Sequence, residues 1–134
     1  MKQRFSSHMT LIELTLALFF LMLAMVTVLG LFTTAYNMSA DAQDLTYAVQ
    51  LAQDCAALIE GSTDPVAALL DMGYEQKEPD TLLHETGDYL VFAQIKKEQT
   101  EVGVLYEATV CVEREGKNLV SLPAVRYNKD VISQ

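Results

Sequence analysis

The feature of this sequence that most limits its fold is an uncharged run of 19 residues from Leu14 to Phe32. Only Thr15, Thr27 and Gly30 interrupt its apolar side chains. A helix rises ~1.5 Å per residue and the hydrocarbon core of a bilayer is ~30 Å thick, so about 20 such residues cross it. A cleaved secretory signal has a shorter apolar core followed by small residues at a cleavage site, whereas this run continues into sequence with helical spacing. We therefore predict a retained, single-pass transmembrane helix.

Charge is unevenly distributed along the chain. Residues 1–8 contain Lys2 and Arg4 and no acid, whereas from residue 41 onward there are 17 acidic and 7 basic residues. Because basic residues favour the cytoplasmic side of a membrane, we expect the N-terminus in the cytoplasm and the acidic part outside the cell membrane. An acidic surface repels a polyanion, so no direct nucleic-acid binding is expected. The basic residues of this part are scattered and form no patch with an aromatic platform; five of the seven are Lys96, Lys97, Lys117, Arg126 and Lys129.

Glu13 lies at the edge of the apolar run, and two interpretations of it are open. The stretch that contains it begins at Met9, with Leu11 and Ile12 before the acid and Leu14 after it. In the first interpretation Glu13 lies at headgroup depth, where a charge costs little, and has no role. In the second its carboxylate is buried and needs a cation, either an α-amine on residue 9 or a group on a neighbouring chain. A partner on a neighbouring chain would couple neutralisation to assembly.

The sequence MTLIEL at residues 9–14 follows a short basic leader and precedes a long apolar helix. This arrangement resembles the N-terminus of type IV pilins and type II secretion pseudopilins. The resemblance implies that a prepilin peptidase cuts between His8 and Met9 and that the new N-terminus of Met9 is methylated. It also implies that Glu13 neutralises the terminus of an adjacent subunit during filament growth. The expected partners are other pilin or pseudopilin subunits, the prepilin peptidase and membrane lipid.

The function that this resemblance implies is that of a minor pilin-like or pseudopilin structural subunit. Such a subunit assembles through its hydrophobic N-terminal helix into a type IV pilus or a type II secretion-like filament at the cell surface. His8 departs from the family pattern, which has glycine before the cut, and an imidazole is bulky where a backbone must approach closely. Either the peptidase accepts His8, or the chain remains an uncleaved single-span membrane protein whose extracytoplasmic head binds a ligand or another protein.

Helical spacing continues beyond the apolar run. Apolar residues recur at three- and four-residue steps as far as Ile59, and most are small enough to lie close against a sheet. We expect one continuous helix from Met9 to Glu60, and the alternative is two helices with a break at residues 37–40. The apolar face of the second half consists of Leu45, Ala48, Val49, Ala52, Cys55, Ala56 and Ile59.

A short second helix is predicted after Gly61. Asp64 is suited to cap its N-terminus, Pro65 to its first position and Gly73 to the left-handed conformation that closes it. The helix is expected to run from Pro65 to Asp71 or Met72. The residues expected to pack against the rest of the domain are Val66, Leu69 and Leu70.

The remaining sequence predicts strands at residues 88–97, 103–115 and 118–128, with a weaker strand at 81–84. The predicted fold class is α+β and pilin-like, with a long N-terminal helix packed on a small antiparallel sheet of three or four strands. The head has too few residues to form a core without the helix. The chain then divides into a basic leader (1–8), a transmembrane helical half called here the stem (9–36), an amphipathic helical half (37–60) and the extracytoplasmic head (61–134).

The two cysteines allow a helix-to-sheet disulfide, as expected for a protein exported from the cytoplasm. Strand alternation argues against this pairing, because Cys111 falls on the opposite side from its neighbours Val110 and Val112, which are expected to face the helix carrying Cys55. Two free thiols are therefore the expectation and the disulfide is the alternative. The sequence has no metal-ligand spacing and no nucleophile motif, so we expect no metal, no cofactor and no enzymatic activity.

Overall fold

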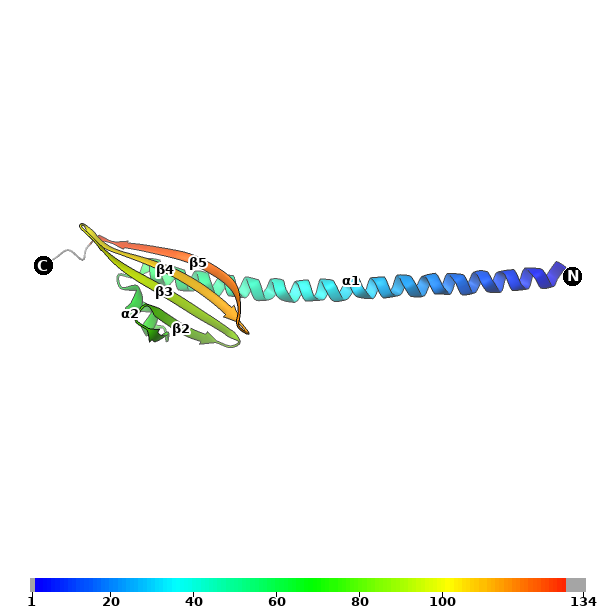
Figure 1. Ribbon diagram of the computed structural model, residues 1–134, viewed down its shortest axis with the longest axis horizontal. Helices are drawn as coiled ribbons and strands as arrows, with labels where there is room; N and C mark the ends of the chain where they lie inside the picture. The colour runs from blue at the N-terminus through cyan, green and yellow to red at the C-terminus, as the bar shows by residue number, and fades with distance from the viewer. Residues whose placement is uncertain (1, 130–134) are drawn as a thin grey trace. The chain divides into compact units, whose positions relative to one another are not determined.

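The structure is a computed structural model that describes residues 2–129, and the side chains of residues 7–129. The chain forms two compact units, Met1–Ala42 and Gln43–Gln134. Two helices are followed in sequence by five strands. In Figure 1 the helices come first along the chain, from blue to green, and the strands follow towards red. The predicted α+β class is therefore confirmed.

Helix α1 runs without interruption from Lys2 to Gly61. The alternative of two helices with a break at residues 37–40 is wrong, since every residue of that segment is helical. The helix also includes residues 2–8, so the leader continues the same helix that carries the stem. Gly30 has no proline beside it and does not break the helix, in keeping with the modest cost of one glycine.

Helix α2, Pro65–Asp71, forms where its capping residues predict. The Asp64 side chain accepts a hydrogen bond from the Ala67 backbone N–H, and Gly73 has φ of 93°, a conformation that favours glycine. Leu69 is fully buried and Val66 packs beside the core. The expectation for Leu70 was wrong, because this side chain is 42% exposed: it follows Leu69 directly and therefore points away from the buried face.

The sheet has five strands, and the expectation of three or four was too low. Its strands pair antiparallel with their sequence neighbours in the order β1-β2-β3-β4-β5. The additional strand is β1, in which all four residues are exposed and which therefore lacks the apolar alternation that marks a buried strand. The strands are β1 Glu75–Glu78, β2 Thr81–Thr86, β3 Tyr89–Thr100, β4 Gly103–Arg114 and β5 Lys117–Asn128.

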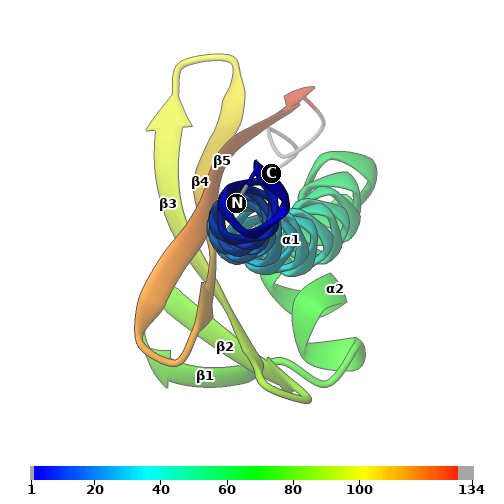
Figure 2. The same cartoon turned by 90° about the vertical axis from the view of Figure 1, so that its right-hand side faces the viewer.

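The core of the second unit lies between the sheet and the C-terminal part of α1. Figure 2 shows α2 and this part of α1 on the same side of the sheet. The helix contributes mainly small residues, which let its backbone approach the strands, and Ile59 is the one large aliphatic side chain among its buried members. The alternation predicted for β4 is confirmed by five buried side chains: Val104, Tyr106, Ala108, Val110 and Val112.

Two contacts hold the end of β5 in place. The Asn128 side chain is 5% exposed, and its Nδ2 donates a hydrogen bond to the Thr63 carbonyl at 3.1 Å, which joins β5 to the segment between the helices. Gly103 lies so close to β5 that a Cβ at this position would be 2.5 Å from the Asn128 carbonyl oxygen. Glycine is therefore required at the start of β4 by this close approach of two backbones.

Candidate functional site: the stem and Glu13

The stem is an apolar helical surface that the rest of the chain does not cover. The helix from Ser7 onward contains a segment long and apolar enough to cross a membrane, and none of its most apolar 18-residue window is buried. Its large side chains are open to their surroundings, for example Met22 at 66% and Leu31 at 71% exposure. A helix from a protein core would be mostly covered by its own chain, so this surface is available to lipid or to other helices.

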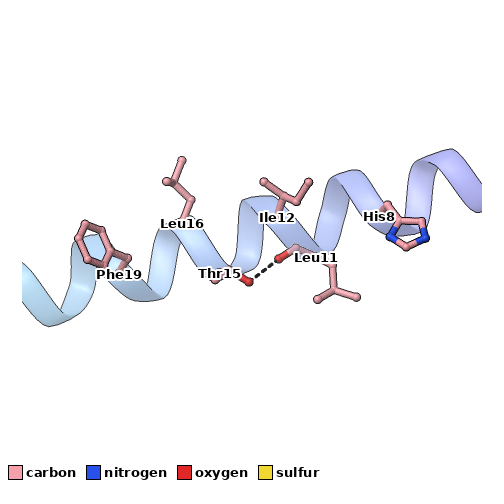
Figure 3. A pocket seen from close by; sticks show the side chains of 6 residues that line it. All are labelled: His8, Leu11, Ile12, Thr15, Leu16 and Phe19. Atoms are coloured by element: carbon pink, nitrogen blue, oxygen red, sulfur yellow. Dashed lines mark hydrogen bonds between the residues drawn. The ribbon is translucent and has the colours of Figure 1, made fainter.

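Threonine hydroxyls within the stem are hydrogen-bonded to the helix itself. The Thr15 hydroxyl donates to the Leu11 carbonyl at 2.8 Å, as Figure 3 shows, and the Thr27 hydroxyl donates to the Ala24 carbonyl at 2.7 Å. A hydroxyl bonded to a carbonyl of the preceding turn needs no partner from outside the helix. These residues are therefore compatible with an apolar environment.

Glu13 is the only Asp, Glu, Lys or Arg between His8 and Asp41. Its helical neighbours three and four positions away are Met9, Thr10, Leu16 and Ala17, and none of these side chains carries a charge. Among the side chains described at residues 7–129, Glu13 forms no ion pair. Within residues 7–129, therefore, no side chain supplies a cation to this carboxylate.

A shallow groove runs along one side of the helix beside His8, and Glu13 is not among its lining residues. Its lining residues recur at steps of three and four, which places them in one stripe. Figure 3 shows their side chains around one stretch of a single helix, so the groove is an open depression between neighbouring side chains and has no enclosing wall. The groove brings His8 beside apolar residues but contains no carboxylate. The lining residues are His8, Leu11, Ile12, Thr15, Leu16 and Phe19.

The two residues at the predicted cleavage point are both within α1. His8 and Met9 are exposed, and the helix passes through them without a turn or bend. Met9 is 72% exposed, so no other described part of the chain covers the bond that the resemblance marks for cleavage. Cleavage between these residues and methylation of Met9 stay predictions.

The cysteines lie apart and both are free. Cys55 is 1% exposed and belongs to the core, and its thiol hydrogen-bonds with the Tyr74 hydroxyl. Burial raises the pKa of the Cys55 thiol above its ordinary value, although the contact with Tyr74 lowers it in part. Cys111 is half-buried, and its thiol donates to the Ser121 hydroxyl at 3.5 Å. The helix-to-sheet disulfide considered from the sequence is therefore absent from these residues.

A polar cluster that the sequence did not reveal joins α1 to the sheet. The Tyr89 hydroxyl donates to Asp44 Oδ1 at 2.9 Å, and the Arg114 guanidinium pairs with the other oxygen of Asp44. Arg114 Nη2 also lies 3.9 Å from Asp88 Oδ2. The guanidinium lies above the Tyr89 ring, and its Cζ is 5.4 Å from the ring centroid. The negative charge of Asp44 raises the pKa of Arg114. Tyr89 and Arg114 lie 45 and 70 residues from Asp44, so no local pattern could have indicated this contact.

Residues 7–129 contain no cluster of side chains that could hold a metal ion. No three His, Cys, Asp or Glu side chains within that range come close enough to hold a metal ion. No protein-family model, curated protein or solved structure matches this chain. The fold and the exposed stem thus define an α+β protein whose one N-terminal helix is long and apolar enough to cross a membrane.

Proposed function

We propose that this protein is a minor pilin-like or pseudopilin structural subunit of a type IV pilus or type II secretion-like filament. The observation that carries the proposal is Glu13, a lone carboxylate in an apolar helical surface with no cation at helical spacing in its own chain. Such a residue favours a neighbour that supplies a positive charge. The motif MTLIEL supports the same function through its resemblance to the pilin N-terminus.

The two halves of α1 differ in burial, and this difference supports assembly through the stem. In the second unit the helix completes the core, and Ala48, Ala52 and Ile59 are fully buried there. The stem has no corresponding partner among the described residues, because its apolar side chains remain exposed. An apolar surface of this kind is stable in lipid and is equally stable against other apolar helices. A stem of this kind can therefore leave the membrane for a filament without exposing its apolar side chains to water.

The proposed topology follows from charge. Lys2 and Arg4 keep the N-terminus in the cytoplasm, the stem crosses the membrane once, and the acidic head lies outside. A prepilin peptidase removes residues 1–8 and exposes the α-amine of Met9. This amine, which is methylated, pairs with Glu13 of an adjacent subunit. In the filament, a subunit whose Glu13 has no such partner retains an unpaired carboxylate among apolar side chains, which is unfavourable. The position along the filament axis that brings Glu13 to the Met9 amine of the neighbouring subunit is therefore favoured.

Neutralising Glu13 tests the proposal. Glu13→Gln keeps the shape of the side chain and removes its charge, while Glu75→Gln makes the same change on the exposed strand β1. Each variant is expressed in cells that make the filament, and its share in the sheared or cross-linked assembly is measured against its share in the membrane. We expect Glu13→Gln to lower incorporation at least tenfold and Glu75→Gln to leave it unchanged. Equal incorporation of the two variants would refute the proposed function.

The second candidate is an uncleaved single-span membrane protein with a ligand- or protein-binding head. Two observations favour it: His8 occupies the position where the pilin pattern has glycine, and α1 continues through His8 and Met9 as regular helix. Intact-mass measurement of the native protein separates the candidates. Loss of residues 1–8, with or without one added methyl group, supports the filament subunit. A full-length chain in cells with an active prepilin peptidase supports the single-span protein.

A further inference from the structure

Tyr36 lies at the end of the stem, and no residue in the described part of the chain forms a hydrogen bond with its hydroxyl. Its side chain is 76% exposed, and it has no hydrogen-bond partner among the side chains described at residues 7–129. The two hydroxyls that precede it differ in this respect. Thr33 and Thr34 donate to the Leu29 and Gly30 carbonyls, each at 3.0 Å. The phenol of Tyr36 must therefore find its partner outside the helix, whereas the threonines do not.

The position of Tyr36 matches the thickness of a bilayer. Because α1 is uninterrupted, the 23 residue steps from Glu13 to Tyr36 correspond to a rise of about 34 Å. A tilt of about 20° shortens this rise to about 32 Å along the bilayer normal. The hydrocarbon core is about 30 Å thick, so a stem that crosses it places Glu13 and Tyr36 just beyond its two boundaries. The next charge, Asp41, lies about 42 Å from Glu13, close to the thickness of the core and headgroups together.

We propose that Tyr36 anchors the stem in the outer headgroup layer of the cell membrane and thereby places Glu13 in the inner, cytoplasmic headgroup layer. The inference rests on the proposed function, in which lipid holds the stem before assembly. A tyrosine ring packs against acyl chains while its hydroxyl bonds with water and with ester or phosphate oxygens, and this is why tyrosine is enriched at membrane interfaces.

This placement determines when Glu13 is dehydrated. In the headgroup layer the carboxylate remains in contact with water, so storage of the subunit in lipid does not require a cation. Movement of the stem outward by one turn would draw Glu13 into hydrocarbon and lift the Tyr36 ring out of the interface. Movement inward would bury the Tyr36 hydroxyl. The stem therefore has one preferred depth, and packing against other stems is the step that removes water from Glu13.

Depth-dependent quenching of tryptophan fluorescence tests this placement. The chain contains no tryptophan, so one introduced residue gives an unambiguous signal. Three aromatic replacements, Phe20→Trp, Phe32→Trp and Tyr36→Trp, are made in the full-length protein in phosphatidylcholine vesicles with nitroxides at known depths. With the bilayer centre midway between Glu13 and Tyr36, the expected distances from the centre are about 7, 11 and 17 Å for residues 20, 32 and 36.

The role of Tyr36 itself is tested with Phe32→Trp as the reporter. Addition of Tyr36→Ala should shift the reporter by about 5 Å, one helical turn, or spread it over several depths. The matched control Met38→Ala removes a side chain of similar exposure, 68% against 76% for Tyr36, that lacks a hydroxyl, and it should leave the depth unchanged. Equal depths in the two double variants would overturn the inference while leaving the membrane span intact. If lipid nitroxides quench none of the tryptophans, the stem does not enter lipid and the proposed membrane-stored subunit fails as well.

Discussion

Replacing Ile59 by alanine tests whether the head depends on α1 for its core. Ile59 is fully buried, and its buried neighbours on the helix are small, so it is the main aliphatic contact that α1 makes with the sheet. The substitution removes three carbon groups, each worth about 0.8 kcal/mol of transfer free energy. The cavity left behind brings the expected loss of unfolding free energy to about 2–5 kcal/mol. Helix propensity favours alanine by less than about 0.7 kcal/mol and offsets little of this loss.

The matched control is Leu45→Ala on the same helix, because Leu45 is 47% exposed. We expect this variant to lie within about 1 kcal/mol of the parent protein. Both variants are unfolded with urea in detergent micelles and followed by the near-ultraviolet circular dichroism of tyrosine. The stem carries only Tyr36, so the change in signal comes mainly from the tyrosines of the second unit. Equal midpoints for the two variants would refute the dependence of the head on Ile59.

Three further predictions concern the second unit. Gly103→Ala should lower its thermal midpoint by several degrees, because the new Cβ would press on the Asn128 carbonyl; an unchanged melting curve would contradict the close approach. Cys111 should react with iodoacetamide in the folded protein, whereas Cys55 should react only on unfolding, since burial covers Cys55 and raises the pKa of its thiol. Peptide mass mapping measures the order of labelling, and labelling of Cys55 before Cys111 would contradict this prediction. Burial also raises the pKa of Tyr74, so the folded state holds this proton more tightly than the unfolded state and loses stability as the pH rises above about 10. Tyr74→Phe should weaken this loss in urea titrations at pH 8 and 11, and an unaltered pH dependence would be contrary to expectation.

The parts of the fold that follow a periodic pattern could be predicted from the sequence. Alternation in β4 indicated which side chains face the helix, and all five of them are buried. The same alternation placed Cys111 away from Cys55, as the structure finds. Capping by Asp64 and Pro65 gave the start of α2. In each of these cases the relevant interactions are local or repeat with the period of the element.

The features that could not be predicted depend on residues far apart in the chain. Strand β1 has four exposed residues and is held by pairing with β2, so its own sequence contains no apolar signal. Asp44 has the appearance of a solvent-facing helical residue, but it binds Tyr89 and Arg114 from the sheet. Leu70 was expected to pack and is exposed, because Leu69 already fills the buried side of a helix of seven residues.

The stem and the head place different demands on one helix. Residues near Ile59 are packed on the sheet, whereas in the proposed function the apolar residues of the stem exchange lipid for the stems of other subunits. In the proposed function these demands do not conflict, because they fall in separate units of the chain. Tyr36 and Glu13, the two residues that mark the ends of the membrane span in the proposed placement, both lie in the unit Met1–Ala42.

The most direct measurement is a carbodiimide cross-link at Glu13. A membrane-permeant carbodiimide joins a carboxylate to an amine only when the two are in contact, and mass spectrometry identifies both ends of the bond. In assembled filaments we expect Glu13 joined to the α-amine of Met9 of another subunit, with no such product from Glu13→Gln. Filaments that form normally while Glu13 is linked to no amine would contradict the proposed role of this carboxylate.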